Sequence, residues 1–160
     1  CDEEAARVNA LGSYAPVALS ANFSIGVAVL KHLAAEAAAL LPDFDIEIIE
    51  THHRMKKDAP SGTAKLLLSA VNPDGTHPTV FGREGFAPRT AGEIGVHAVR
   101  GGTVAGVHTV SFFGDEEELS LTHRAESRRI FAIGALKTAE KLKDAPVGLH
   151  PLDELLFARR

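Results

Sequence analysis

The sequence predicts an α/β or α+β fold in which a mixed β-sheet packs against helices. Three observations support this class: apolar residues recur at helical spacing over 25–41, they alternate over 44–49, and several strand-like runs lie between 94 and 123. The chain has 160 residues and is 45% hydrophobic, which suffices for one globular core. We therefore expect a single domain over residues 1–160.

The N-terminal quarter predicts two helices around a short strand. The first nine residues are polar and helical in character, residues 16–22 form a short buried strand that ends in a polar loop, and Ser24 caps a helix over 25–41. Pro42 and Asp43 end that helix. Its expected apolar stripe consists of Val27, Leu30, Leu33, Ala34, Ala37 and Leu41.

The next segment predicts a half-buried strand followed by a helix. Phe44, Ile46 and Ile48 alternate with less apolar residues, so one face of this strand is buried and His52 stands at its exit. Functional residues often lie at the carboxyl ends of strands in α/β folds. A helix over 63–71, a turn over 72–76 and a loop to Pro88 follow.

The C-terminal half predicts three neighbouring antiparallel strands and a helix. Strands over 94–99 and 104–113 are joined by the glycine-containing residues 100–103, which suit a tight hairpin. The acidic run 115–118 is expected to be a solvated turn before a strand over 119–123. Ser127 leads into a helix over 129–142, whose expected inner stripe is Ile130, Ile133, Leu136 and Leu142.

Composition excludes several classes of function. The net charge of −4 comes from mixed signs spread along the chain, which argues against nucleic-acid partners and anionic membranes. Cys1 is the only cysteine, so an internal disulfide framework is impossible and a cytoplasmic location fits. Charged residues interrupt the longest apolar run, so no membrane span is expected.

Residues 50–64 carry the chemistry. His52 and His53 can move protons near neutral pH, Lys56 can hold or protonate an anion, and the turn Pro60–Thr63 can open a helix whose free N–H groups bind a carboxylate. An ordinary helix cap and solvated lysines would explain each part separately. Because the parts converge near one helix N-terminus, we expect a small anion that undergoes proton transfer.

A metal site is an alternative interpretation of the histidines. His97, His108 and His123 might join the histidine pair as zinc ligands. The spacing matches no known metal motif, no thiolate pair is present, and adjacent lysines oppose a divalent cation. We therefore expect no metal, and we expect His108 and His123 to be hydrogen-bonded residues of the sheet.

The run Glu50-x-His52-His53-x-x-Lys56-x-Asp58-Ala-Pro-Ser-Gly-Thr-Ala64 resembles the signature of the dihydrodipicolinate reductase family. These enzymes are also called 4-hydroxy-tetrahydrodipicolinate reductases and act in lysine and diaminopimelate biosynthesis. Similar agreement extends over runs 20–26, 92–102, 106–109 and 122–128, so the resemblance covers nearly the whole chain. It implies the glyceraldehyde-phosphate-dehydrogenase-like (GAPDH-like) C-terminal domain fold of that family.

The resemblance also implies roles for individual residues. His52 is the expected principal acid/base and Lys56 a second proton donor. The expected ligands of the substrate carboxylates are His53, Ser61, Gly62 and Thr63. The expected nicotinamide-cofactor segment is Ser20, Ala21, Asn22 and Phe23, with Arg128 close to it. Hydride from NADPH or NADH would reduce a cyclic dicarboxylate with an electron-poor C=N bond while an acid protonates it.

The sequence departs from this family in one large respect. No Gly-x-x-Gly-x-x-Gly turn follows a strand, so we expect the chain to be the substrate-binding and oligomerisation domain, with residues 1–20 a remnant of the junction to a nucleotide-binding domain. The resemblance implies a homotetramer built through the sheet. The alternative is a stand-alone, catalytically silent dicarboxylate-binding and assembly module, and a metal-assisted hydrolase is a third hypothesis.

Overall fold

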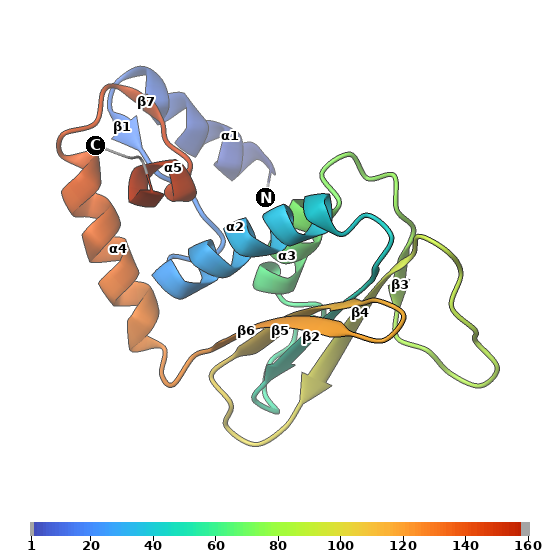
Figure 1. Ribbon diagram of the computed structural model, residues 1–160. Coiled ribbons are helices and arrows are strands. Elements are labelled where there is room, and N and C mark those ends of the chain that lie inside the picture. Colours follow the sequence, from blue (N-terminus) through green and yellow to red (C-terminus); the bar gives the residue numbers. More distant parts are fainter. Residues whose placement is uncertain (1, 158–160) are drawn as a thin grey trace. The chain divides into compact units, whose positions relative to one another are not determined.

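The computed structural model describes residues 2–157, which divide into two compact units (Figure 1). The first unit consists of the described parts of Cys1–Ala28 and Arg129–Arg160, and the second is Val29–Arg128. Both contain helices and strands, and the second contains the larger sheet, so the mixed α/β class is confirmed. No helix within residues 2–157 is long and apolar enough to cross a bilayer.

The second unit is built on a five-stranded sheet in the order β3-β4-β2-β5-β6. The strand β2 lies at its centre, parallel to β4 and antiparallel to β5. The edge strand β3 is parallel to β4, and the other edge strand β6 is antiparallel to β5. The bounds are β2 (Asp45–His52), β3 (Thr79–Phe81), β4 (Ile94–Arg100), β5 (Val107–Phe113) and β6 (Glu118–Arg124).

Two helices cover one face of this sheet (Figure 1). They are α2 (Ile25–Leu40), which belongs to this unit from Val29 onward, and α3 (Gly62–Val71). Because strand side chains alternate between faces, every second residue of β2 points toward the helices. The resulting core contains Leu30, Ala34, Ala37, Ile46, Ile48, Ala64, Leu67, Val71, Ile94, Val96, Val110 and Phe112.

The first unit combines both ends of the described chain. A two-stranded parallel sheet pairs β1 (Pro16–Val17) with β7 (Gly148–Leu149). The helices of this unit are α1 (Asp2–Ala10), the 3₁₀ turn η1 (Leu11–Ser13), α4 (Arg129–Leu142), α5 (Leu152–Phe157) and the start of α2. Ser24 caps α2 as expected, because its Oγ accepts a hydrogen bond from the amide of Val27 at 3.3 Å.

The hairpin expected over 94–113 is wrong. Strands β4 and β5 do not pair with each other, since β2 lies between them, and β4 is parallel rather than antiparallel to β2. The connection crosses the end of β2 instead: Gly101 N donates to His52 O, Arg54 N to Gly102 O, and His53 N to Val104 O. The glycines at 101 and 102 therefore serve a crossover and not a two-residue turn.

Several boundaries and stripes also differ from expectation. The strand expected over 16–22 is only Pro16–Val17, the strand expected from 104 begins at Val107, and β3 was missed because it has only three residues. Leu33 is 47% exposed at the margin of the α2 stripe. The other residues expected in that stripe are buried or half-buried.

The inner stripe expected for α4 is correct only in part. Ile130 and Leu142 are half-buried, but Ile133 and Leu136 are exposed, and the buried positions are Gly134 and Thr138. The reason is a close approach of main chains: a Cβ at Gly134 would overlap the carbonyl oxygen of Phe23. Small residues therefore face the segment that precedes α2, and the larger residues of α4 lie to either side.

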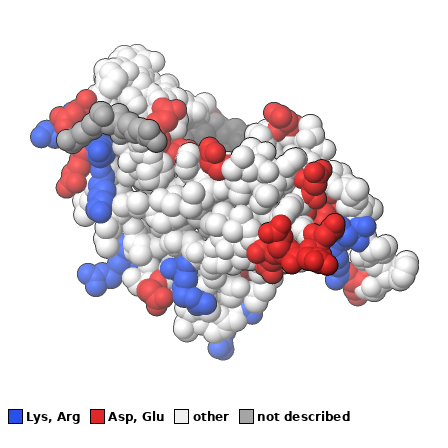
Figure 2. All heavy atoms as spheres, viewed as in Figure 1, with Lys and Arg blue, Asp and Glu red and all other residues white. Residues whose placement is uncertain are grey.

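The acidic turn between β5 and β6 is solvated. All four residues of the run 115–118 are exposed, although Glu118 already belongs to β6. Figure 2 shows acidic side chains gathered on the surface where this turn lies. Its exposure agrees with the expected solvated turn.

The close approach at Gly134 generates a stability prediction. An alanine in a helix interior normally stabilises by about 1 kcal/mol relative to glycine. Because a Cβ at this position overlaps the Phe23 main chain, we expect Gly134→Ala to lower the free energy of unfolding by about 1–3 kcal/mol instead. Urea unfolding followed by circular dichroism measures the change.

The matched control is Gly101→Ala. A Cβ at Gly101 would have no neighbour within 4 Å, so this variant should stay within about 0.5 kcal/mol of the wild type. A Gly134→Ala variant as stable as the wild type would contradict the packing described for α4.

Candidate functional site

Strand β2 brings Glu50 and His52 to the same face of the sheet. Residues two apart in a strand share a face, and the buried positions of β2 are 46, 48, 50 and 52. Glu50 is fully buried and His52 is 8% exposed. The prediction that the strand delivers His52 at its carboxyl end is confirmed, and it stands on the face that the helices cover.

The Glu50 carboxylate forms hydrogen bonds with residues of three different segments. His52 Nδ1 lies 2.6 Å from its Oε2. The two terminal nitrogens of Arg100 donate to the two oxygens at 2.8 and 2.7 Å, and the amide of Ser61 donates to Oε1 at 3.0 Å. One carboxylate therefore joins the histidine, strand β4 and the start of α3.

This environment keeps Glu50 ionised. Burial alone would raise the pKa of the Glu50 carboxyl, but the hydrogen bonds from Arg100, His52 and the Ser61 amide outweigh burial and lower the pKa below its ordinary value. A negative charge is thus fixed beside the imidazole, and bidentate pairing with a guanidinium compensates its burial.

The chain turns directly after His52. Lys56 N donates to His53 O at 3.1 Å, and His53 itself is half-buried. The Lys56 ammonium lies 2.8 Å from Asp58 Oδ1, and this hydrogen bond lowers the pKa of the Asp58 carboxyl. Arg100 also donates to Asp58 O at 2.8 Å, so the guanidinium that holds Glu50 also fixes this loop.

The expected anion cradle is the N-terminus of α3. Ser61 is its N-cap: the Oγ accepts from Ala64 N at 3.1 Å, and the residue is 2% exposed. Thr63 is also buried, whereas Gly62 is exposed. The first turn of α3 contains no acidic residue, so the positive end of the helix dipole is not neutralised from within the helix.

His108 lies between His52 and the N-terminus of α3 and contacts both. It lies opposite Glu50 in the β2–β5 register, and its Nε2 lies 3.1 Å from Ser61 Oγ. Its ring meets that of His52 edge to face, with centroids 5.0 Å apart. A Cβ at Gly106 would lie 3.1 Å from His52 Nε2, so the glycine leaves room beside that nitrogen.

His108 is held neutral. Burial, assisted by the positive charge of a protonated His52 nearby, lowers its pKa to about 4. It is therefore a polar link between strand β5 and the helix cap rather than a proton donor near neutral pH.

Sequence reasoning missed several members of this site. Arg100 was assigned to a turn, His108 to the sheet alone, and neither Gly106 nor Glu50 received a role. The i, i+2 spacing of Glu50 and His52 within a predicted strand was a usable signal, because such residues share a face.

His97 belongs to the opposite face. Its Nε2 lies 2.7 Å from Glu47 Oε2, and Arg83 and Arg89 also contact Glu47. Since Arg83 also pairs with Glu93, this network ties the segment 82–93 to the sheet. Within residues 2–157, no three His, Cys, Asp or Glu side chains form a group that could hold a metal ion.

The expected cofactor segment, Ser20–Phe23, lies in the first unit and is a fixed turn. Ser20 Oγ donates to Asn22 O at 2.8 Å, and Asn22 Oδ1 accepts from Ser24 N at 2.7 Å. Asn22 is buried and Ala21 is exposed. Arg128, at the end of the second unit, is exposed.

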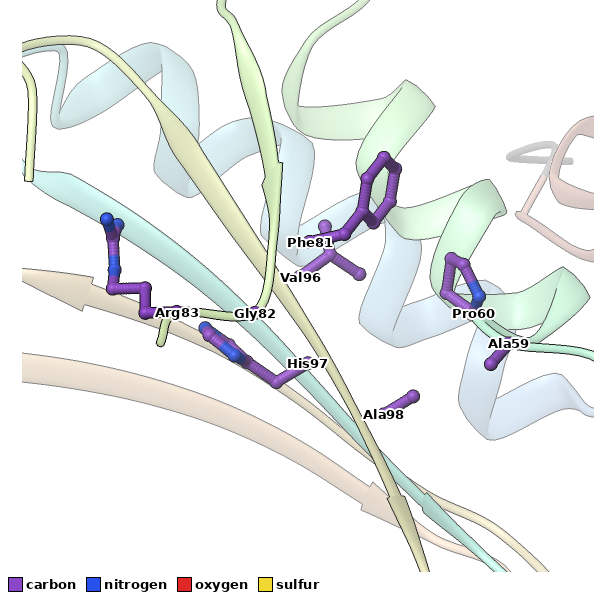
Figure 3. Close-up of a pocket in the computed structure, with 8 residues that line it drawn as sticks. All are labelled: Ala59, Pro60, Phe81, Gly82, Arg83, Val96, His97 and Ala98. Carbon is purple, nitrogen blue, oxygen red and sulfur yellow. The ribbon is translucent and has the colours of Figure 1, made fainter. Parts of the chain in front are cut away.

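A separate pocket of about 560 Å³ lies beside the end of β3 (Figure 3). Its two polar side chains, Arg83 and His97, already contact Glu47. The pocket shares only Ala59 and Pro60 with the motif of residues 50–64, and none of the expected acid/base residues lines it. Its lining is Ala59, Pro60, Phe81, Gly82, Arg83, Val96, His97 and Ala98.

Similarity to known proteins shows the family of this chain. Residues 26–156 match the family model described as "Dihydrodipicolinate reductase, C-terminus". The chain belongs to the dihydrodipicolinate reductase family. A 4-hydroxy-tetrahydrodipicolinate reductase from Methanocorpusculum labreanum is 47% identical over 142 residues, which are 88% of this chain and 56% of that protein. One from Rubrobacter xylanophilus is 45% identical over 160 residues, covering 97% and 62%.

A solved dihydrodipicolinate reductase has the same fold. The dipicolinate-bound enzyme from Paenisporosarcina sp. TG-14 superposes with a TM-score of 0.73 at 25% identity, covering 96% of this chain and 60% of that one. The chain thus spans between half and two thirds of the length of these dihydrodipicolinate reductases.

The buried His108 generates a pH prediction. Between pH 6.5 and about 4 the unfolded chain binds a proton at this residue and the folded chain does not, so stability falls as the pH is lowered. At pH 5 this should remove about 2 kcal/mol of unfolding free energy relative to pH 7. Urea unfolding at both pH values measures the loss, and His108→Asn should lose less by this amount.

The control is His77→Asn at an exposed histidine, which should show the pH dependence of the wild type. Glu50 and Glu93 have lowered pKa values, so they weaken the fold mainly below pH 4.5. His123, whose pKa burial also lowers, acts in the same direction and remains in both variants. Equal losses in wild type and His108→Asn would contradict a neutral His108.

Proposed function

We propose that this chain is the substrate-binding part of a 4-hydroxy-tetrahydrodipicolinate reductase, an NAD(P)H-dependent oxidoreductase of lysine and diaminopimelate biosynthesis. The observation that carries the proposal is the Glu50 carboxylate, which contacts both His52 Nδ1 and the Ser61 amide. Through it a proton-carrying imidazole and a helix N-terminus are held within one small volume. That combination suits a doubly negative substrate that is protonated while it is reduced.

The cradle at α3 would hold the substrate carboxylates. Gly62 lets the main chain approach a ligand closely, the hydroxyl of Thr63 adds a donor, and the helix dipole favours negative charge at this end. His53 and Ser61 complete the proposed binding set. Lys56 would add a positive charge and act as a second proton donor, exchanging its contact with Asp58 for the substrate.

The identity of the ligand is supported by a relative. The Paenisporosarcina enzyme is described as bound to dipicolinate, an aromatic ring with two carboxylates. A ring of this kind matches the requirement for two anionic groups on a flat scaffold. We therefore infer a cyclic dicarboxylate as the substrate class of this chain.

His52 would act as the acid. When bound, the nicotinamide cofactor supplies hydride to the electron-poor C=N bond. The developing negative charge on nitrogen needs a proton, and an imidazolium beside the fixed Glu50 charge is suited to donate it. Water exclusion by the buried residues around His52 would strengthen these electrostatic contacts.

The segment 20–23 would receive the nicotinamide end of NADPH or NADH. Its side-chain hydrogen bonds are used internally by Ser20 and Asn22, so the ligand would meet main-chain groups and the exposed Ala21. A preformed turn of this kind fits a planar carboxamide.

The sheet face opposite α2 and α3 would support assembly. Ile49, Val99 and Phe113 belong to the strand positions that face away from α2 and α3, and each is at least 39% exposed. Apolar side chains on an open sheet face mark an interface. We propose that copies of the chain associate through this sheet, as a homotetramer.

Binding of pyridine-2,6-dicarboxylate tests the substrate site. We expect the isolated chain to bind this molecule, and Lys56→Ala and Thr63→Val each to weaken binding about tenfold or more, because each removes a group that contacts an anion. Isothermal titration calorimetry measures the affinity. Lys57→Ala and Thr76→Val, at exposed positions, are matched controls expected to leave it within about twofold. No binding, or equal affinity in all variants, would refute the site.

If His52 is the acid, its substitution should lower turnover much more than it lowers the affinity for the ligand. In the full-length natural polypeptide, His52→Ala should lower turnover by about 100-fold or more, because proton donation contributes mainly to the chemical step. The affinity for pyridine-2,6-dicarboxylate should change only a few-fold. Steady-state kinetics with NADPH and with NADH measure turnover, and an unchanged rate would exclude His52 as the acid.

A further inference from the structure

We propose that Glu50 is a positioning residue for the reaction: it keeps the His52 proton on Nδ1, directs Nε2 to the substrate, and fixes the distance between that nitrogen and the carboxylate cradle. This inference rests on the proposed function and assigns a role to a residue that touches no substrate.

The tautomer follows from the hydrogen bond at Nδ1. An ionised carboxylate can only accept, so at 2.6 Å the His52 Nδ1 must be the donor in both the neutral and the protonated ring. Within residues 2–157, His52 Nε2 has no hydrogen-bond partner, and it lies next to Gly106, which has no side chain. Nε2 is therefore the nitrogen available to gain and lose a proton.

The cradle is fixed by the other carboxylate oxygen. Glu50 Oε1 accepts from the amide of Ser61 at 3.0 Å, and Ser61 Oγ in turn accepts from Ala64 N. Glu50 therefore occupies the first N–H group of the cap and leaves the exposed Gly62 next in line for a ligand. Any shift of the carboxylate would move the histidine and the helix start relative to each other.

Arg100 holds the carboxylate itself in place. It lies opposite His52 in the β2–β4 register, so its side chain reaches Glu50 along the diagonal. The residue directly opposite Glu50 is Ala98, whose methyl group leaves space for the guanidinium. Because two parallel hydrogen bonds fix both carboxylate oxygens, rotation of the carboxylate is prevented.

The chain offers a matched control on the same strand. Glu47 is three residues earlier, faces the other side of the sheet, contacts His97 at 2.7 Å and is also paired with arginines. It thus reproduces the carboxylate–histidine–arginine chemistry without contacting His52 or Ser61. A substitution there should disturb the strand equally but leave the candidate site intact.

The test measures the tautomer of His52 directly. Two-bond ¹H–¹⁵N correlation spectra of the ¹⁵N-labelled chain above pH 8 distinguish the two neutral forms of the ring, and His52→Asn assigns the signal. We expect the Nδ1–H form in the wild type and in Glu47→Gln. In Glu50→Gln the Nε2–H form should appear, because a glutamine amide can donate to Nδ1.

Ligand binding provides the second readout. Pyridine-2,6-dicarboxylate should bind Glu50→Gln about tenfold more weakly than the wild type, since the helix start is released, and Glu47→Gln within about twofold of it. A wild-type His52 protonated on Nε2 would overturn the proposal without any variant, which covers the case in which Glu50→Gln does not fold. A tautomer unchanged in a folded Glu50→Gln would also overturn it.

The two proposals fail separately. If the wild-type chain does not bind the dicarboxylate, the proposed function fails whatever the tautomer is. If the wild type binds but the tautomer and the affinity are the same in Glu50→Gln and Glu47→Gln, the substrate site stands and only the positioning role of Glu50 is refuted.

Discussion

A carboxylate buried in a protein core must be paired with a positive charge and have its hydrogen-bonding capacity filled. Glu50 meets this requirement with groups from three places in the chain: Arg100 on β4, His52 two residues away, and the Ser61 amide at the start of α3. Each of these groups is thereby held at hydrogen-bond distance from one carboxylate. The geometry of the candidate site therefore follows from the need to neutralise a single buried negative charge.

Local patterns were sufficient for α1 to α4 and the central strand, whereas the short elements β7 and α5 were not predicted. Alternation over 44–49 identified β2 and its buried face, and Ser24 marked the start of α2. The order of strands could not be read in the same way, because glycines at 101 and 102 suit a hairpin and a crossover equally well. Only the hydrogen bonds from this connection to the end of β2 distinguish the two, and these join residues far apart in the sequence.

The candidate site was likewise predictable where its residues are close in the sequence, and not where they are far apart. The histidines, Lys56 and the turn before α3 lie within fifteen residues, so their motif was visible and its resemblance to a family was specific. Arg100 and His108 come from strands that lie beside β2 only after the sheet has formed. The exposed stripe of α4 was misjudged for a related reason: a glycine packed on main chain leaves no mark in a hydrophobic pattern.

The parallel pairing of β2 with β4 has a consequence for how the protein folds. The antiparallel strands β5 and β6 are close in sequence and can pair early. Arg100 and Glu50, by contrast, are separated by 50 positions in the sequence. Until that long-range contact closes, the glutamate has no cation and cannot enter the core in ionised form. We therefore expect β4 to dock later than β5 and β6 pair, and a nascent chain that ends before Arg100 would leave Glu50 on the central strand without its counter-ion.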